Sequence, residues 1–300
     1  MLQQCIKHNA KGTIFIRKRW QTYASVMKKI FVALFLTVII VNAYAQVDSV
    51  YTSLPNALKN KNQVYSLNLS KSSLSELPES IGELTNLRFL DLGINQLKSL
   101  PESIGKLINL EVLDLYFNPI SSLPKSICNL TRLRKIVAID NRLNSLPKDF
   151  GNLVNMEELL LNNNKITELP ESFTNLTKLK YLGLTANYIT RLPDSIGNLI
   201  NLEELWLSLN ELTTLPISLG KLTLLKKMSI SENHISELPE SVVNLTELEL
   251  LTMSGNKLSW LPQLIGKLSQ LKRLDLSRNL LSETEKDRLN KLFPNCSIYY

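Results

Sequence analysis

Residues 77–99 read LPESIGELTNLRFLDLGINQLKS, and residues 100–122 repeat the pattern as LPESIGKLINLEVLDLYFNPISS. The same 23-residue frame continues without insertion or deletion through most of the chain, and a looser copy precedes it. The ten copies begin at Leu54, Leu77, Leu100, Leu123, Leu146, Leu169, Leu192, Leu215, Leu238 and Leu261. A fixed period of about 20–29 residues with leucine at set offsets predicts a solenoid of stacked units.

Each repeat contains the pattern of one short strand. Counting from the leucine of Leu-Pro, apolar residues fall at positions 1, 5, 8, 11, 14, 16 and 21. Positions 14 and 16 alternate with polar or variable neighbours, which predicts a half-buried strand whose open face carries positions 13, 15 and 17. Such a strand is too short to be stable alone, so we expect the stacked copies to pair in parallel.

Proline and asparagine mark the two bends of each repeat. Proline follows the first leucine in all ten copies, and it ends the extended segment because it fixes φ and donates no backbone hydrogen bond. The apolar residues at positions 5 and 8 then predict a helical or 3₁₀ turn on the opposite side of the unit. From the second copy onward, asparagine stands at position 19, where a column of amides can satisfy the backbone groups of a sharp turn.

The combination LxxLxLxxN with LPxxI upstream resembles the leucine-rich repeat family, in the 23-residue class shared by Ras-suppressor-like and many bacterial members. The resemblance covers residues 54–283. It implies an α/β fold: a curved solenoid, or horseshoe, with a parallel β-sheet on the concave face, short helical or 3₁₀ turns on the convex face, and terminal caps. It also implies a scaffold that binds another macromolecule, with no shared catalytic residue or cofactor.

The N-terminal segment has the pattern of a secretory signal peptide. Met27 begins MKKIFVALFLTVIIVNAYAQ, which has a basic start, an apolar run of about 12 residues and a small-x-small cleavage site ending at Ala45. This run is shorter than the roughly 20 residues that a membrane span needs, and Gln46 offers no cysteine for a lipid, so we expect no stable membrane anchor after cleavage. We therefore predict a secreted or periplasmic bacterial protein with its signal peptide at 27–45, and we interpret residues 1–26 as an upstream extension of the gene model.

The net charge of +7 is a property of this N-terminal segment. Residues 1–45 contain seven Lys or Arg and no acid, so the remaining residues carry 27 basic and 27 acidic side chains. A mature chain without net positive charge is a poor candidate for binding a phosphate backbone. The charge balance therefore argues against a nucleic-acid partner.

Sequence signals at both ends of the repeats predict caps, which a solenoid needs to cover its terminal cores. Residues 46–63 form the N-terminal cap, because apolar residues at three- and four-residue spacing predict a short amphipathic helix. These apolar residues are Val50, Tyr51, Leu54, Ala57 and Leu58.

Residues 284–300 form the C-terminal cap. The SETE segment at 282–285 predicts a capping box that opens a helix through about Leu292. Leu289, Leu292 and Phe293 are expected to face the last repeat, and residues 297–300 can add a terminal strand.

Residues that could carry chemistry are scarce. Cys128 and Cys296 lie about seven repeats apart, beyond the reach of a disulfide, and His234 occupies a variable position that we expect to be exposed. Asp91 and Asp114 share position 15 of adjacent copies, so we expect their carboxylates to be near neighbours. The sequence shows no nucleophile–base pair, metal cluster or cofactor motif, and we predict a non-enzymatic protein.

Positions 12 and 13 of successive copies alternate in charge. The alternating residues are Arg88, Glu111, Arg134-Lys135, Glu157-Glu158, Lys180, Glu203-Glu204, Lys226-Lys227, Glu249 and Lys272-Arg273. Equal positions in neighbouring parallel strands lie about 4.8 Å apart, so these charges predict cross-strand ion pairs that set the register. We interpret them as structural rather than as a ligand site.

A second set of side chains on the open face of copies two to seven predicts a partner-binding site. It combines apolar and aromatic residues at positions 13, 15, 17 and 18 with polar residues beside them. The set is Phe89, Asp91, Asp114, Tyr116, Phe117, Val137, Ile139, Asp140, Leu160, Asn162, Tyr181, Trp206 and Leu209. An exposed apolar patch of this kind is unusual for a monomer and suggests a contact surface.

We therefore predict an extracytoplasmic scaffold that binds a protein partner through this face. Exposed aromatic rings beside carboxylates also suit sugar rings, so a glycan-binding module is an alternative. A structural or adhesive surface protein is a further alternative, and it would tolerate loss of the patch without loss of function.

Overall fold

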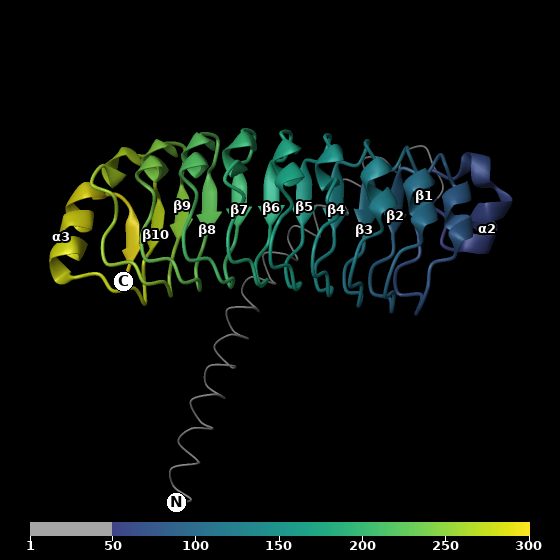
Figure 1. The fold of residues 1–300 in the computed structure, drawn as a ribbon, viewed down its shortest axis with the longest axis horizontal. Coiled ribbons are helices and arrows are strands. Elements are labelled where there is room, and N and C mark those ends of the chain that lie inside the picture. Colours follow the sequence, from purple (N-terminus) through teal and green to yellow (C-terminus); the bar gives the residue numbers. More distant parts are fainter. Residues whose placement is uncertain (1–49) are drawn as a thin grey trace, which may run out of the picture. The chain divides into compact units, whose positions relative to one another are not determined.

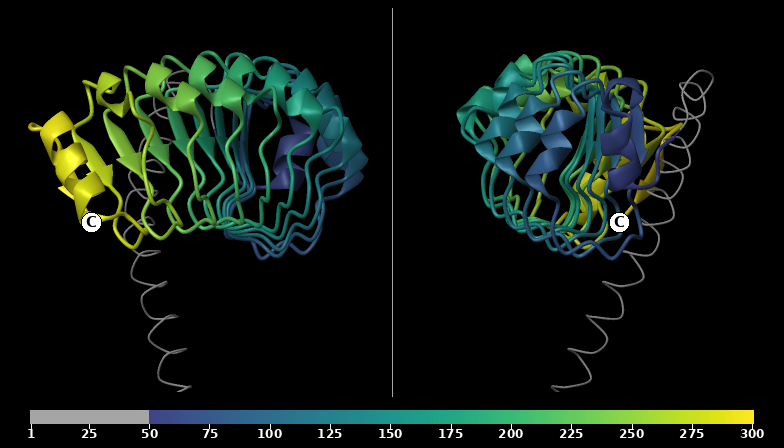
Figure 2. Two further views of the ribbon diagram at one scale, coloured as in Figure 1. Left: turned by 60° about the vertical axis from the view of Figure 1, so that its left-hand side comes forward. Right: turned by 90° about the vertical axis from the view of Figure 1, so that its right-hand side faces the viewer.

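The computed structural model describes residues 50–300, and the expected signal peptide and upstream segment lie outside the described residues. Within this part of the chain, eleven parallel strands form one sheet in sequence order, from β1 to β11 (Figure 1). The repeats stack in an arc whose inner side carries the strands and whose outer side carries the 3₁₀ turns (Figure 2). The predicted curved solenoid is confirmed.

The strands are three residues long and recur in the same place of each repeat. They are β1 (Ser66–Asn68), β2 (Phe89–Asp91), β3 (Val112–Asp114), β4 (Lys135–Val137), β5 (Glu158–Leu160), β6 (Tyr181–Gly183), β7 (Glu204–Trp206), β8 (Lys227–Ser229), β9 (Leu250–Thr252), β10 (Arg273–Asp275) and β11 (Ser297–Tyr299). The register is unshifted, so Leu90 lies between Leu67 and Leu113. Each repeat position therefore forms a column across the sheet.

The return path of each repeat is a 3₁₀ turn. These turns are η1 (Lys61–Gln63), η2 (Glu79–Glu83), η3 (Glu102–Lys106), η4 (Lys125–Asn129), η5 (Phe150–Asn152), η6 (Glu171–Asn175), η7 (Ile196–Asn198), η8 (Ile217–Lys221), η9 (Glu240–Asn244) and η10 (Ile265–Lys267). Pro78 precedes η2 with φ −72°, and its carbonyl accepts the N–H of Ile81 at 3.0 Å. Neighbouring turns approach closely: a Cβ on Gly151 would lie 1.9 Å from the carbonyl oxygen of Ser172.

The core is a continuous column of leucine and isoleucine side chains between the sheet and the 3₁₀ turns. Leu87, Leu90 and Leu92, at positions 11, 14 and 16 of one repeat, are fully buried, and the pattern recurs along the chain. At position 5, Phe150 and Phe173 replace the usual isoleucine and stack with ring centroids 6.4 Å apart. Burial thus follows the apolar positions of the sequence pattern.

The asparagine column closes the turn after each strand, as the sequence predicts. The Nδ2 group of Asn164 donates to the carbonyl oxygens of Ala138 at 2.8 Å and Leu161 at 3.0 Å. Its Oδ1 accepts the N–H of Leu143 at 2.9 Å. One amide therefore bonds its own repeat and the preceding one, and equivalent bonds recur from Asn95 to Asn279.

A second asparagine column, at position 10, was not predicted from the sequence. Each of these amides donates to the carbonyl of position 9 in the preceding repeat, at 2.7–3.0 Å. The residues are Asn86, Asn109, Asn155 and Asn201. Because they lie at the surface, where water can replace them, they contribute less than the buried column.

The N-terminal cap differs in part from the expectation. The helix α2 (Leu54–Lys59) covers the first core with Ala57, but it begins only at Leu54, next to a proline at its N-terminus. Tyr51 forms a parallel bridge with Leu67 instead of a helical turn. The prediction of one helix that includes Val50 and Tyr51 is therefore wrong, because the N–H of Tyr51 donates to Ser66 at 3.0 Å and its carbonyl accepts from Asn68 at 2.8 Å along the free edge of β1.

The C-terminal cap contains the expected helix and strand. The helix α3 (Glu283–Leu292) begins after Ser282, whose Oγ accepts the N–H of the third helical residue at 3.2 Å. Leu289 and Phe293 are buried, and Leu292, although 40% exposed, also lies against the last repeat as predicted, since a Cβ on Gly266 would lie 3.2 Å from its Cδ2. The strand β11 pairs with β10. Across residues 50–300, no helix has the length and apolar character needed to span a membrane.

We expect Asn164→Ala to lower the free energy of unfolding by about 1–3 kcal/mol, because buried backbone groups lose their partners. The matched control is Asn155→Ala, which removes two surface bonds, one to the Thr131 carbonyl and one from Lys178 Nζ, and should cost less than about 0.5 kcal/mol. Urea denaturation followed by circular dichroism measures both changes. Equal losses in the two variants would contradict the role given to the buried column.

Candidate binding face of the sheet

From Arg134 onward, most of the alternating charges at positions 12 and 13 pair across the strands, as predicted. Arg88 lies over the ring of Tyr65 instead, and Arg273 pairs with Asp275. Lys135 Nζ lies 2.5 Å from Glu158 Oε2, and Lys227 Nζ lies 2.7 Å from Glu204 Oε1. Further pairs are Arg134–Glu157, Lys180–Glu157, Lys226–Glu203 and Lys272–Glu249. The charges that form these cross-strand pairs neutralise one another, so we do not assign them as ligand contacts.

The middle of the concave face, over β4 and β5, is closed. Val137 and Ile139 are each 1% exposed and Leu160 is 4% exposed, so the prediction that they belong to an exposed patch is wrong. Lys135 and Asn162 are buried beside them. The amide oxygen of Asn162 accepts a backbone N–H of the next repeat at 2.9 Å, which is a structural role. On the inner side of a curved sheet, side chains of neighbouring strands converge and cover one another.

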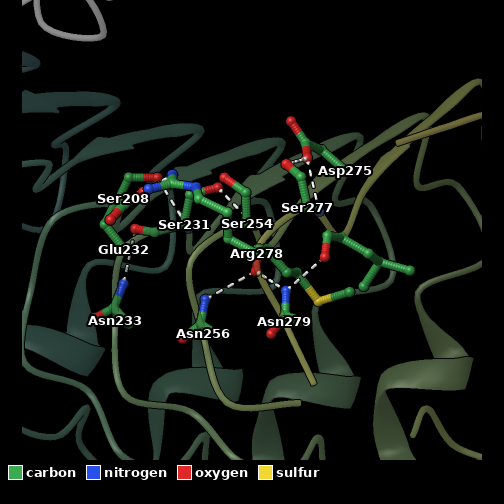
Figure 3. A network of polar contacts seen from close by, with 12 residues as sticks. Ser208, Ser231, Glu232, Asn233, Ser254, Asn256, Asp275, Ser277, Arg278 and Asn279 are labelled. Atoms are coloured by element: carbon green, nitrogen blue, oxygen red, sulfur yellow. Dashed lines mark hydrogen bonds and ion pairs between the residues drawn. The ribbon is translucent and has the colours of Figure 1, made fainter. Parts of the chain in front are cut away.

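The face over β8 to β10 is polar, and its groups bind one another (Figure 3). Ser231 Oγ accepts the N–H of Ser254 at 3.1 Å. Arg278 forms an ion pair with Glu232, two repeats away, across Gly255. A Cβ on Gly255 would lie 2.7 Å from Glu232 Oε1, so a side chain there would obstruct the bridge. This half of the face has few groups left for a partner.

Position 18 adopts the left-handed conformation in every repeat, with φ between 55° and 67°. Glycine occupies this position only at Gly255, while Ile94, Phe117 and Leu209 place bulky apolar side chains there. The left-handed region is unfavourable for such residues by about 1–3 kcal/mol, most of all for a β-branched one. Ile94 is 41% exposed and Phe117 is 56% exposed, so neither is held there by burial in the core. Ile94 is not among the site residues predicted from the sequence.

Five of the predicted site residues come together over β2, β3 and the turns that follow them, and Ile94, which was not predicted, lies with them. We call it the first patch: Phe89, Asp91, Ile94, Asp114, Tyr116 and Phe117. The rings of Tyr116 and Phe117 lie 5.9 Å apart at 50°. Asp91 and Asp114 are direct partners in the β2–β3 register, as predicted. The first patch therefore combines two adjacent carboxylates with apolar side chains on one surface.

The carboxylates of the first patch hold the backbone and are poorly solvated. Asp91 Oδ1 accepts the N–H of Gly93 at 2.8 Å, and Asp114 Oδ1 accepts the N–H of Tyr116 at 2.8 Å. Burial, followed by the charge of Asp91, raises the pKa of Asp114 to about 7. Burial also raises the pKa of Asp91. Over residues 50–300, no three His, Cys, Asp or Glu residues are placed to hold a metal ion.

The remaining predicted residues lie apart from the first patch. Tyr181, Trp206 and Leu209 form a second group near β6 and β7, all partly buried, and Trp206 Nε1 donates to Glu204 Oε2 at 3.0 Å. Asp140 borders the first patch. The pKa of Tyr116 is raised mainly by burial and further by the charge of Asp140. The closed middle separates the two groups, so the structure does not support one continuous patch over copies two to seven.

The sequence matches the family described as "Leucine-rich repeat region" over residues 63–143 and 136–214, and "Leucine rich repeat" over residues 200–258. The chain belongs to the leucine-rich repeat family. Domains of this family are typically protein-binding scaffolds and generally non-catalytic. No curated protein matches the sequence.

Solved structures share the fold of this leucine-rich repeat chain. The ectodomain of the Arabidopsis thaliana receptor kinase GASSHO1/SCHENGEN3, in complex with Casparian strip integrity factor 2, is 33% identical with a TM-score of 0.71, covering 81% of this chain and 30% of that one. A TDR receptor is 31% identical with a TM-score of 0.73, and the match covers 84% of this chain and 46% of the receptor. An internalin (inlF) from Listeria monocytogenes is 24% identical with a TM-score of 0.59, and the match covers 81% of this chain and 82% of the internalin. The chain thus spans less than half of either receptor.

The raised pKa of Asp114 makes stability depend on pH. Between its ordinary value of 3.8 and about 7, the folded state keeps a proton that the unfolded state has lost, so the free energy of unfolding falls as pH rises. The charged groups around it are Asp91 and Lys135. Asp114→Asn stays neutral and keeps an oxygen to accept the N–H of Tyr116.

We expect Asp114→Asn to match the parent near pH 4 and to exceed it by more than about 1 kcal/mol near pH 8, since one pKa unit corresponds to about 1.4 kcal/mol. Denaturation across this pH range measures the difference. A difference that stays constant with pH would contradict the burial of an ionisable carboxyl at this position.

Proposed function

We propose that this leucine-rich repeat protein binds another protein through the first patch on the concave face. The observation that carries the proposal is the pair Ile94 and Phe117, which are exposed apolar side chains in an unfavourable backbone conformation. Neither residue belongs to the buried core. A contact surface explains exposed apolar residues that folding itself does not need.

The location of the first patch supports the same proposal. From β4 onward most charges of positions 12 and 13 pair with one another, the middle of the face is closed, and the polar residues over β8 to β10 bind one another. The first patch is left with exposed apolar atoms and two carboxylates. Aromatic and aliphatic anchors of this kind supply most of the binding energy in protein interfaces.

The relatives add support by analogy. The GASSHO1/SCHENGEN3 ectodomain was crystallised with Casparian strip integrity factor 2, and this chain is similar to 30% of its length. The partner of the present chain is set by its own surface residues, since a shared fold does not carry specificity.

Our proposal also places the protein outside the cytoplasm, as a secreted or periplasmic protein. The support is the signal-peptide pattern from Met27 to Ala45. We expect the mature natural protein to begin at Gln46, and mass spectrometry of its N-terminal peptide measures this. A natural chain that retains residues 27–45 would contradict the proposal.

Partner capture tests the binding face. We expect Ile94→Ser combined with Phe117→Ser to abolish retention of a protein that the parent captures from the native cell envelope and medium. The matched control combines Ile108→Ser with Ile217→Ser, because both residues are exposed isoleucines that lie outside the sheet, beside η3 and in η8. Circular dichroism checks that all three proteins are equally folded.

The outcomes separate the candidate functions. Loss of the partner in the first-patch variant alone supports the proposal, and the captured protein names the partner. Equal retention by the two variants would place the binding site elsewhere. Retention of a glycan on a sugar array, lost in the first-patch variant, would favour the glycan-binding alternative instead.

A further inference from the structure

Three repeats carry aspartate at position 15, and they differ in what stands beside the carboxylate. In β10, Asp275 Oδ2 lies 3.8 Å from Arg273 Nη2, and Ser277 Oγ donates to Asp275 Oδ1 at 2.5 Å. Arg273 is at position 13 of the same strand, two residues before the aspartate and on the same side of the sheet. A cation of the chain itself therefore stands beside this carboxylate.

The equivalent positions beside Asp91 and Asp114 are apolar. Position 13 is Phe89 in β2 and Val112 in β3. Within residues 50–300, neither of these aspartates forms an ion pair, and Lys135, whose charge acts on Asp114, is bound to Glu158. Burial outweighs the favourable charges of Lys71 at Asp91 and of Lys135 at Asp114. Two adjacent carboxylates thus lack the cation that Asp275 has.

Position 17 is also unusual at this point of the sheet. The residue there is Gly93. Its φ lies outside the left-handed region, so the backbone conformation at this position does not require glycine. A Cβ on Gly93 would lie 3.1 Å from Asp91 Oδ1 and 3.5 Å from Asp114 Oδ1. The missing side chain therefore leaves room next to both carboxylates.

Apolar side chains surround the same carboxylates. Phe89 is partly buried, Phe117 and Ile94 are exposed, and Tyr116 lies against Phe117. A lysine or arginine side chain matches such surroundings, because its aliphatic stem packs on apolar residues and aromatic faces attract its charge. A free inorganic cation would gain little from this apolar wall.

We propose that the Asp91–Asp114 pair receives a lysine or arginine side chain of the protein partner, in the place that Arg273 takes beside Asp275. This inference rests on the proposed function and specifies the partner chemistry: a basic residue flanked by apolar residues. The partner's charge is paired with two carboxylates, while Ile94 and Phe117 contact its apolar neighbours.

The electrostatics of the pair predict that binding depends on pH. A bound cation favours the ionised carboxylates, and Asp114 is largely protonated below its pKa of about 7. The other charged groups are Lys71, which acts on Asp91, Lys135, which acts on Asp114, and Asp140, which acts on the neighbouring Tyr116. Affinity for a basic peptide should therefore rise about tenfold or more from about pH 5 to about pH 8, because only the ionised fraction of Asp114 is competent to bind.

The test uses a phage-displayed library of random short peptides, selected at about pH 8 on the immobilised full chain. We expect retained peptides to carry a lysine or arginine next to apolar residues. Replacing that basic residue by methionine should weaken binding to the parent by about tenfold or more, since it leaves the carboxylates unpaired. The double variant Asp91→Asn, Asp114→Asn should bind the selected peptide and its methionine form equally. The control variant Asp275→Asn should distinguish the two peptides as the parent protein does.

The results distinguish this inference from the function on which it rests. Selected peptides that lack a basic residue and still fail to bind the Ile94→Ser, Phe117→Ser variant would contradict the cation site. That result would leave the binding face supported. A methionine replacement that weakens binding equally with and without Asp91 and Asp114 would overturn it too. If the parent retains no peptide better than the Ile94→Ser, Phe117→Ser variant does, both the binding face and the cation site are wrong.

Discussion

The buried asparagine at position 19 is the interaction on which the structure depends. Each amide bonds backbone groups of its own repeat and of the preceding one, so it closes the turn after a strand and joins two units. In the turn that it closes, the preceding residue, at position 18, has the left-handed conformation, and Lys71 has it in the first repeat too, where Ser72 replaces the asparagine. The side chain at position 18 is then presented at the rim of the sheet whether or not that conformation suits it.

This constraint explains how a repetitive fold carries a local binding surface. Stacking in unshifted register makes every repeat position a column, so polar and charged groups find partners in the next repeat. What remains for a partner is the set of residues that the columns do not satisfy. In this chain these are the apolar residues at Ile94 and Phe117 and the carboxylates of Asp91 and Asp114, all over β2 and β3.

The fold followed from the sequence because its determinants are local and repeated. The leucine positions, the proline after each strand segment, the asparagine column and the alternating charges each have one structural meaning at a fixed period. The exposure of the concave face did not follow in the same way. Alternation places Val137, Ile139 and Leu160 on the open face, but their burial depends on curvature, which no single repeat encodes.

Ile94 shows a different limit of the sequence analysis. Its importance comes from a backbone conformation that apolar residues rarely adopt. The signal was present in the column: Asp140, Asn163 and Gly255 share position 18, and all three residue types tolerate the left-handed region. Comparing residue types down a column, rather than along a strand, would have selected Ile94 together with Phe117.

The central claim is that the partner lies on the first patch and not elsewhere on the solenoid. Hydrogen–deuterium exchange of the chain with and without its captured partner tests it most directly, because backbone amides report contact along the whole chain. We predict slower exchange at residues 88–96 and 111–119 on binding, with no change in η2 to η10. Protection confined to those 3₁₀ turns, or to β8–β10, would contradict it.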